Sequence, residues 1–464
     1  MTVALPRPRP ARQGPTDFTL PVDRAEIDGI APIEGTADWL PADRQAAFDA
    51  FEALPSESNV LYTTYIDLRS VQLQAARLVN SPRTEPLSAE LPDGTDGLIV
   101  IDEGDVAGVA LSPEAAAAGV EFTAIADLAR RDPERVRALL EGGSALPSDD
   151  RFAQLTRALW TQGVILHIPA GVRLVRPIIV RWAAGAAGRA LLSRTIITLG
   201  DGAQAVVLEE LVGSATVSPA SPTNPDGGQS FLAGTLEVTL GRGAKLEVAS
   251  LQELPSTTVA FQHRTAVIGE GATLHWALAQ LGARLVRSRV DNRLEGDRSS
   301  VEQVEIVFGG TDQVFDLTSY THHIGRDTTG NLLSKGALLD RARSFMKGMI
   351  VIDRSAVGTD SFLGEFGMNL SKATRSVAIP SLEIDQPDCR RAAHASSVGP
   401  IDEGQLFYLE TRGIPPDEAR RIIVLGFLEP VVARVPQAEA RERLRDLLEQ
   451  KWDAGIGVGA VAAA

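Results

Sequence analysis

The chain has 464 residues, of which 44% are hydrophobic and 5% aromatic, with 42 glycines and 27 prolines. The apolar content suffices for a sizeable core, and the glycines and prolines favour many turns. The net charge of −15 argues against nucleic acid as a partner, because an acidic surface repels phosphate backbones. No run approaches the ~18 uncharged apolar residues of a membrane span, so we expect no membrane partner.

Cysteine usage limits the chemistry further. Cys389 is the single cysteine, so an internal disulfide is excluded and a reducing, cytoplasmic setting is expected. One thiolate also cannot build a four-cysteine iron–sulfur or zinc site. We therefore expect no tightly bound cofactor in this chain alone, and any cluster must take ligands from another chain.

The N-terminal part divides into two segments. Residues 1–40 begin with MTVALPRPRPARQGP, whose prolines and polar composition predict a disordered tail. Residues 41–162 are predicted to form a mainly helical domain, with helices over Asp43–Leu54, Ile66–Val79 and Phe122–Arg131. Pro113 and Pro133 occupy plausible first-turn positions of two further helices.

From residue 163 the pattern changes to short β-branched runs that end in glycine turns. A G-x-G-A turn recurs at Gly200–Ala203, Gly241–Ala244 and Gly269–Ala272, with spacings of 41 and 28 residues. Such recurrence predicts stacked coils of a β-solenoid, in which the glycines supply positive φ angles. An antiparallel sandwich with glycine hairpins accounts for the pattern equally well.

The last part of the chain is predicted to be helical again. Gly404–Arg412 forms a first helix that Gly413 can end in the left-handed conformation. Pro415 and Pro416, followed by two acidic residues, open a second helix. A third helix is predicted by apolar residues at three- and four-residue intervals, namely Ala440, Leu444, Leu447 and Leu448.

Enzyme motifs are lacking. G-x-x-x-x-G-K-[ST] does not occur, and the G-x-G-A turns lack the strand–helix context of a dinucleotide site. We therefore expect this chain to be no enzyme, with no catalytic residues of its own, and any ATP hydrolysis to belong to a partner.

The second half of the chain carries a set of short motifs. They are SKGAL at Ser334–Leu338, ARS at Ala342–Ser344, Asn369–Leu370, PSLEID at Pro380–Asp385, HASSVG at His394–Gly399, DEGQLFYL at Asp402–Leu409, Arg412–Ile414 and GFLEP at Gly426–Pro430. Together these motifs are specific, and the region from about residue 163 to 435 resembles the SufB/SufD family of iron–sulfur cluster assembly proteins.

This resemblance implies a fold and a set of partners. The fold is mainly β: a right-handed parallel β-helix core, here residues 163–393, between the N-terminal helical domain and a C-terminal helical domain, residues 394–464. The implied role is a scaffold subunit of the SUF complex that assembles iron–sulfur clusters. Its implied partners are a SufB chain, bound through the β-helix, and the ATPase SufC, bound through the C-terminal helices.

Two residue features favour the SufD type over the SufB type. SufB sequences carry a glutamate directly after the motif histidine and a cysteine that serves cluster assembly, whereas Ala395 follows His394 here and Cys389 is the only cysteine. One feature departs from the SufD pattern: many SufD chains place a cysteine two residues before that histidine, where this chain has Ala392. We interpret this as a cysteine-less subtype, because a ligand moved to Cys389 would face the other way on a strand. The SufB type remains an alternative.

A second alternative is a β-helical carbohydrate-active enzyme, for which Glu209, Glu210 and Glu247 are candidate acids. Nothing in their pattern singles these three residues out. A purely structural β-solenoid would leave the C-terminal motifs unexplained.

His394 is the predicted metal residue. A neutral imidazole binds iron, and the resemblance places His394 at the SufB interface, where iron or a cluster would be held transiently. The competing interpretation is a histidine that only donates or accepts a hydrogen bond there. Phe407, Tyr408 and Arg412 are the predicted partner contacts, because aromatic and arginine side chains are favoured anchors.

Three other residues are assigned structural roles. His322 and His323 are neighbours on a strand, so they point to opposite faces and cannot easily share one metal. Cys389 is expected to be inert, although Arg390 and Arg391 would favour its thiolate if their side chains were close.

Overall fold

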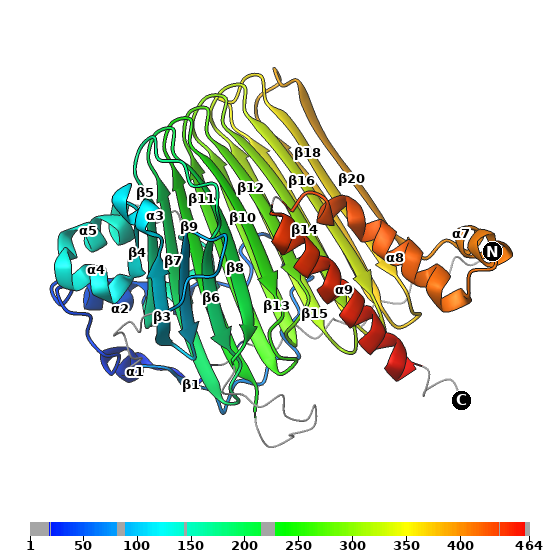
Figure 1. Ribbon diagram of the computed structural model, residues 1–464, viewed down its shortest axis with the longest axis horizontal. Coiled ribbons are helices and arrows are strands. Elements are labelled where there is room, and N and C mark those ends of the chain that lie inside the picture. Colours follow the sequence, from blue (N-terminus) through cyan, green and yellow to red (C-terminus); the bar gives the residue numbers. More distant parts are fainter. Residues whose placement is uncertain are drawn as a thin grey trace, which may run out of the picture.

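A computed structural model describes residues 18, 20–80, 89–142, 146–214, 228–435 and 437–459. Its centre is a parallel β-helix of two facing sheets, each with ten strands. From β5 onward successive strands alternate between the sheets, so each of these strands pairs with the strand two places along the chain (Figure 1). The mainly β, solenoidal fold predicted from the sequence is confirmed, and the antiparallel sandwich is excluded.

The strands of the first sheet, called sheet A, are β1 (Arg77–Leu78), β4 (Glu121–Ala124), β5 (Gln162–Ile168), β7 (Arg189–Leu199), β9 (Ser230–Leu240), β11 (Thr258–Ile268), β13 (Leu285–Leu294), β15 (Val314–His323), β17 (Arg343–Ile352) and β19 (Arg375–Ile384). Those of sheet B are β2 (Gly97–Asp102), β3 (Asp105–Leu111), β6 (Ile178–Ala184), β8 (Gln204–Gly213), β10 (Lys245–Gln252), β12 (Thr273–Gln280), β14 (Ser300–Gly309), β16 (Thr329–Leu338), β18 (Asp360–Asn369) and β20 (Arg391–Pro400).

The repeated G-x-G-A turns join sheet A to sheet B and stack on one another. The second glycine of each turn has a φ of 62–67°, which favours glycine. The amide of Gly202 donates to the carbonyl of Arg242 on the next turn over 2.8 Å. The first glycine is needed for close stacking, because a Cβ on Gly241 would lie 2.8 Å from the Asp201 nitrogen. The uneven spacing arises because the longer interval contains the β8–β9 connection, residues 214–229.

Three apolar layers hold the fold together. The innermost lies between the sheets and includes Ile101, Trp182 and Trp276. A second lies on the outer face of sheet A beneath the N-terminal region, with a cluster of aromatic rings from Phe18, Phe152 and others. A third joins the outer face of sheet B to the C-terminal helices. Both sheets are therefore covered on both faces over most of their length, as parallel sheets require.

The N-terminal region closes one end of the β-helix. Its helical elements are α1 (Arg24–Asp28), α2 (Leu40–Ala53), α3 (Pro113–Ala117), α4 (Ile125–Arg131), α5 (Pro133–Arg137), the π-helical turn η1 (Ala138–Gly142) and α6 (Arg151–Leu159). Strands β3 and β4 pair antiparallel with β2 and β5 and end the two sheets there. Residues 41–162 thus combine helices with four strands.

Two N-terminal expectations need correction. Ile66–Val79 is not a helix but a series of turns ending in β1, because Leu68, Leu73 and Ala76 are buried against sheet A. Of the predicted disordered tail, residues 20–40 are folded and include α1, while Phe18 is 4% exposed against other phenylalanines. In residues 20–40, burial of apolar side chains outweighed the polar and proline-rich composition that predicted disorder. Residues 1–17 and 19 lie outside the described part, so the prediction for them is not tested.

The C-terminal region contributes α7 (Glu403–Thr411), α8 (Pro416–Val432) and α9 (Ala438–Gly459). Gly413, with a φ of 83°, follows α7 as predicted. Helices α8 and α9 lie across the outer face of sheet B, and α7 lies at the end of the molecule opposite α4 and α5 (Figure 1). The helical region was expected from residue 394, but β20 continues the β-helix through Pro400 and places that boundary inside a strand.

Candidate functional site

The last coil of the β-helix is open to solvent. β19 and β20 are the terminal strands of sheets A and B, and within the described residues no strand pairs with their outer edges. Their side chains are partly or fully exposed, whereas the preceding β17 is almost entirely buried. Ile384 and Val398, at the ends of β19 and β20, are 45% and 39% exposed. The open coil therefore presents two ten-residue edges with exposed apolar side chains.

His394 lies on β20 and is exposed. It pairs in parallel register with Leu363 of β18, which is buried inside the β-helix. Paired residues of parallel strands project from the same face, so the His394 imidazole lies on the inner face of the last coil. The position of His394 is therefore fixed by strand pairing, while its side chain remains accessible to another molecule.

Glu365 lies one coil deeper and was not singled out in the sequence. It pairs with Ser396, two residues after His394, and is 2% exposed. The amide of Ile379 donates to its Oε2 over 2.9 Å. Burial raises the pKa of this carboxyl to about 7, opposed by the Ile379 hydrogen bond and by Lys347. Its position follows only from the register of β18 and β20, a long-range feature that no local motif signals.

Cys389 precedes β20 rather than lying on it. The strand-alternation argument for its orientation therefore fails, and its side chain packs against the same inner cluster as Ala392, with Leu382. Arg391 donates to Asp360 over 2.6 Å, and Arg390 is paired with Asp327. Both guanidinium groups thus already have carboxylate partners close by.

The predicted partner contacts gather on α7. Phe407 and Tyr408 are 69% and 57% exposed, and the Arg412 guanidinium lies 5.2 Å from the centre of the Tyr408 ring. Tyr408 also lines a hollow of about 400 Å³ between α7 and α8, together with Gln405 and Ile423. By contrast, Leu428 of α8 is fully buried. Phe427, also on α8, packs against the apolar layer between sheet B and the C-terminal helices, as expected for residues that hold the helices on the sheet.

The paired histidines point to opposite faces, as predicted. His323 is fully buried, with its ring nitrogens 2.8 Å from Thr328 Oγ1 and 3.0 Å from Ser361 Oγ. Burial lowers its pKa to about 3, so this imidazole is neutral. His322 lies on the outer face, with Nε2 3.7 Å from an Asp353 carboxylate oxygen. The two rings do not converge on one site.

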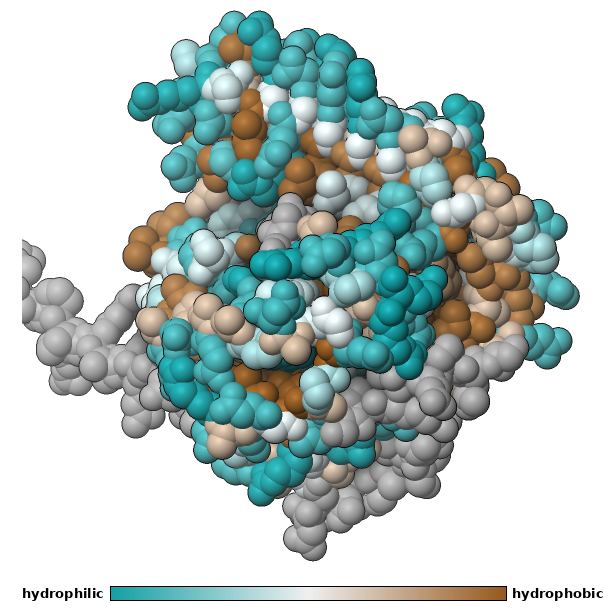
Figure 2. Space-filling view, turned by 90° about the vertical axis from the view of Figure 1, so that its left-hand side faces the viewer, coloured by the Kyte–Doolittle hydropathy of each residue, from teal (hydrophilic) through white to brown (hydrophobic). Residues whose placement is uncertain are grey.

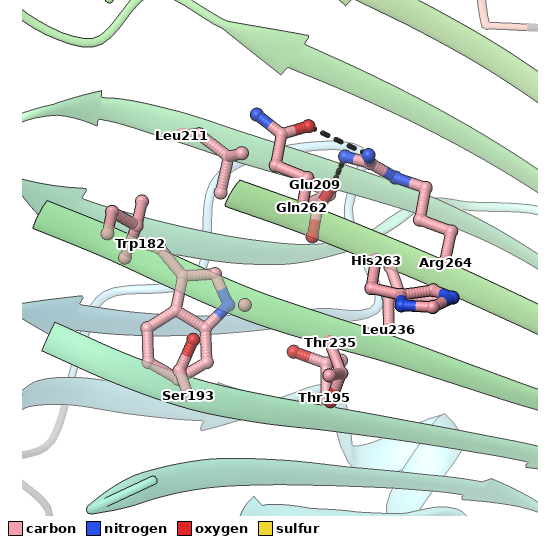
Figure 3. Close-up of a pocket in the computed structure, with 12 residues that line it drawn as sticks. Trp182, Ser193, Thr195, Glu209, Leu211, Thr235, Leu236, Gln262, His263 and Arg264 are labelled. Carbon is pink, nitrogen blue, oxygen red and sulfur yellow. Dashed lines mark hydrogen bonds and ion pairs between the residues drawn. The ribbon is translucent and has the colours of Figure 1, made fainter. Parts of the chain in front are cut away.

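The acids considered for carbohydrate chemistry do not converge either. Glu209 points into the β-helix, where Arg264 donates to its carboxylate over 2.6 Å and to Gln262 over 2.8 Å (Figure 3). The adjoining cavity of about 20 Å³ holds little more than one water molecule. Glu210 points outward and accepts from Arg181, and Glu247 lies on another strand with its side chain on the outer face. No sugar-binding cleft is formed by these residues.

In the described part of the chain, no group of three or more His, Cys, Asp or Glu residues is arranged to hold a metal ion. His394 therefore offers a single nitrogen donor, and a complete coordination sphere would need ligands from elsewhere. Among the described helices, none combines the length and apolar character that crossing a bilayer requires.

Comparison with known proteins agrees with this architecture. The family model "SUF system FeS cluster assembly, SufBD core domain" matches residues 182–427, more than half of the chain. The iron–sulfur cluster assembly protein SufD of Bacillus subtilis is 28% identical over 380 residues, which cover 79% of this chain and 84% of that protein. A SufBD-family protein of Mycobacterium tuberculosis is 29% identical over 336 residues, 70% and 78% of the two chains.

The same family also includes SufB proteins. SufB of Bacillus subtilis is 25% identical to this chain over 311 residues, 67% of this chain and 64% of that protein. The β-helix, the open last coil and the matched core domain all lead to one assignment: the chain is a member of the SufB/SufD family of SUF-system iron–sulfur cluster assembly proteins.

Proposed function

We propose that this protein is a SufD-type, non-catalytic subunit that assembles iron–sulfur clusters together with a SufB-type chain and a SufC-type ATPase. The observation that carries the proposal is the open last coil, which presents an accessible histidine at the end of the β-helix where, among the described residues, the outer strand edges are unpaired. Such an end is suited to completion by a second chain. The single cysteine of the chain supports a reducing, cytoplasmic setting.

The SufD type is supported by residues as well as by similarity. Ala395 follows His394 where SufB sequences carry a glutamate, and the chain lacks further cysteines for a thiolate-rich site. The SufD relative also aligns over more of both chains than the SufB relative does. A SufB-type scaffold would need thiolate ligands that Cys389 alone cannot supply.

The edges of β19 and β20 support an interface with the SufB-type chain. Long unpaired edges expose backbone donors and acceptors, and natural proteins usually cover or interrupt such edges. Here ten-residue edges coincide with exposed Ile384 and Val398. Pairing with strands of another chain would satisfy the backbone groups and bury both apolar side chains.

The surface of α7 supports docking of the ATPase. Phe407 and Tyr408 are large, exposed and adjacent, and the hollow beside Tyr408 can accept an apolar side chain. Arg412 beside the Tyr408 ring adds a positive, planar group at the rim. Aromatic and arginine side chains are common among the hot-spot residues that contribute most of the binding energy of protein interfaces.

His394 is proposed to assist iron entry. Iron is the cargo of the reaction here, and a neutral imidazole nitrogen is a suitable transient donor for it. The remaining ligands would come from the SufB-type chain across the interface.

Co-purification tests the partner assignment. The tagged chain is expressed with the SufB and SufC homologues of its own organism and analysed by size-exclusion chromatography with mass detection. We expect a stable complex that contains all three chains. If this chain elutes alone and binds neither partner, the SufD-type assignment is wrong, and a screen of glycan binding would follow.

Substitution tests the role of His394. In the purified complex, we expect His394→Ala to leave the subunit composition unchanged and to lower the iron content measured after cluster assembly. His322→Ala is the matched control, since this imidazole is also solvent-accessible but lies on the outer face of sheet A. An iron yield equal to that of the control would leave His394 with a hydrogen-bonding role only.

A further inference from the structure

A cleft lined by four arginines lies on the outer side of sheet A, beside the first residue of β19. It forms where residues 67–70 of the N-terminal region meet the first residues of β15 and β17, and its volume is about 300 Å³. We call it the arginine cleft. Its lining residues are Asp67, Arg69, Ser70, Arg284, Asp312, Val314, Arg341 and Arg343.

The arginine cleft has the opposite charge to the rest of the chain. Its lining carries four positive charges and two negative ones, an excess of two, in a protein whose net charge is −15. The carboxylates of Asp67 and Asp312 remain ionised near neutral pH, because hydrogen bonds from Arg69 and Arg341 hold their pKa values below the ordinary value. The positive excess is therefore permanent at neutral pH.

The two carboxylates do not satisfy all four guanidinium groups. Arg69 and Arg341 make paired contacts of 2.6–2.8 Å with Asp67 and Asp312 respectively. Arg343 reaches Asp67 through one longer contact of 3.2 Å, and Arg284 lies 3.8 Å from Asp312. A guanidinium carries five N–H donors. Among the described residues, most donors of Arg284 and Arg343 have no acceptor, so they can bind a ligand.

The environment favours a charged ligand. The side chains of Arg284 and Arg343 are 33% and 42% exposed, so they are partly shielded from water while still reachable. Val314 forms an apolar part of the lining. Partial shielding strengthens a charge–charge contact relative to the open surface, and planar arginine forks match the oxygens of a phosphate group.

We propose that the arginine cleft binds a small phosphate-bearing anion, either free phosphate or the phosphate group of a small monoester. A phosphate dianion would compensate the excess of two positive charges and accept hydrogen bonds from Arg284 and Arg343. The site can be tested separately from the assembly role proposed above, because none of its lining residues belongs to the open coil or to α7.

Calorimetric titration of the full chain tests this site. Inorganic phosphate and glycerol 3-phosphate are titrated separately into the protein at constant ionic strength in a chloride buffer, so that general screening is matched. We expect saturable binding of at least one probe, about tenfold weaker in Arg284→Ala, which corresponds to about 1.4 kcal/mol. The probe that binds more tightly identifies free phosphate or a monoester as the ligand class.

Two further variants separate binding from a structural role. Asp312→Asn removes a negative charge from the lining and should therefore tighten phosphate binding. The same substitution weakens the Arg341–Asp312 ion pair, so if the arginines served only a structural role, it would not be expected to tighten binding. Arg242→Ala removes an exposed arginine that is paired with Asp201 at the turns on the other side of the β-helix. This variant should bind phosphate with the affinity of the wild type. No saturable binding of either probe, or equal affinity in wild type and Arg284→Ala, would overturn the proposal.

Discussion

The strands of the β-helix pair in parallel from β5 and β6 through β19 and β20, but its two ends are built differently. At the N-terminal end, β3 and β4 turn antiparallel, and the helices of the first 160 residues pack against the sheets. That end presents a surface made mainly of hydrophilic residues, with separate apolar patches (Figure 2). At the C-terminal end, β19 and β20 stop with parallel edges free among the described residues and with apolar side chains exposed.

This difference shows that one end of the β-helix is covered by the chain itself and that the other end is left open. Covering a sheet edge with helices or loops is one way in which proteins protect it, and helices of the N-terminal region pack against the sheets at that end. Among the described residues the C-terminal end lacks such a cover, although the chain continues into three helices that could have supplied one. Those helices lie instead on sheet B, with α7 directed away from the body of the molecule (Figure 1).

The largest expected effect compares one isoleucine at each end. Ile101 on β2 is fully buried in the inner core, whereas Ile384 on β19 is 45% exposed. Ile101→Ala should lower the free energy of unfolding by about 2–5 kcal/mol, because it leaves a cavity in a packed core. Ile384→Ala should lower it by less than about 1 kcal/mol in the isolated chain. Chemical denaturation of both variants measures the difference, and equal losses would mean that the C-terminal end is closed in solution.

The next prediction locates the depth at which the open end begins. Glu365 is buried although Ser396, its neighbour on β20, is exposed. Its pKa is about 7 in the folded chain against an ordinary value of 4.5. The unfolded chain therefore releases this proton at lower pH than the folded chain, and stability falls as pH rises from about 4.5 to 7. The interval corresponds to about 3 kcal/mol.

Glu365→Gln tests this by removing the titration while keeping an acceptor for the Ile379 amide. Unfolding free energies of wild type and variant are measured between pH 4.5 and 8. The wild type should lose about 3 kcal/mol more than the variant over this range. Parallel pH profiles would show that water reaches the carboxyl and that the open end extends one coil further into the β-helix.

A third comparison separates folding from association. Ile384→Asp combined with Val398→Asp places two charges on the apolar rim of the open coil. In the isolated chain both sites are partly exposed, so stability should change by about 1 kcal/mol or less. In a pull-down with the SufB-type chain, burial of unpaired charges should weaken binding at least 100-fold, about 2.7 kcal/mol. Unchanged binding would place that partner on another surface.

How much of this molecule could be read from its sequence differs between local and long-range features. The stacked turns were predicted because Gly202, Gly243 and Gly271 must adopt positive φ, a requirement carried by single residues. The C-terminal helices carried their own start and stop signals, such as Gly413. Ile66–Val79 was assigned wrongly because its apolar spacing suits a helix, while its burial on sheet A determines the conformation.

The candidate site shows the same division. His394, Phe407 and Tyr408 lie in recognisable motifs, so they could be named in advance, although their exposure could not. Glu365 and the arginine cleft depend on which coil lies beside which, as with Arg343 and Asp67, 276 residues apart. Cys389 was placed on a strand by its distance from His394, but the strand begins two residues later at Arg391.

The smallest expected effect concerns α7, which extends the comparison to the helices. Phe407→Ala removes a 69% exposed ring that makes no contribution to the described core clusters, so folding should be unaffected. If α7 is the docking surface, affinity for the SufC-type ATPase should fall about tenfold, about 1.4 kcal/mol, as measured by titration. Arg420→Ala on α8 is the control, because that side chain is also exposed but belongs to a surface ion pair with Asp417. Equal affinities of the two variants would show that the exposed aromatic pair does not dock the ATPase, and would leave the open coil as the sole predicted docking surface.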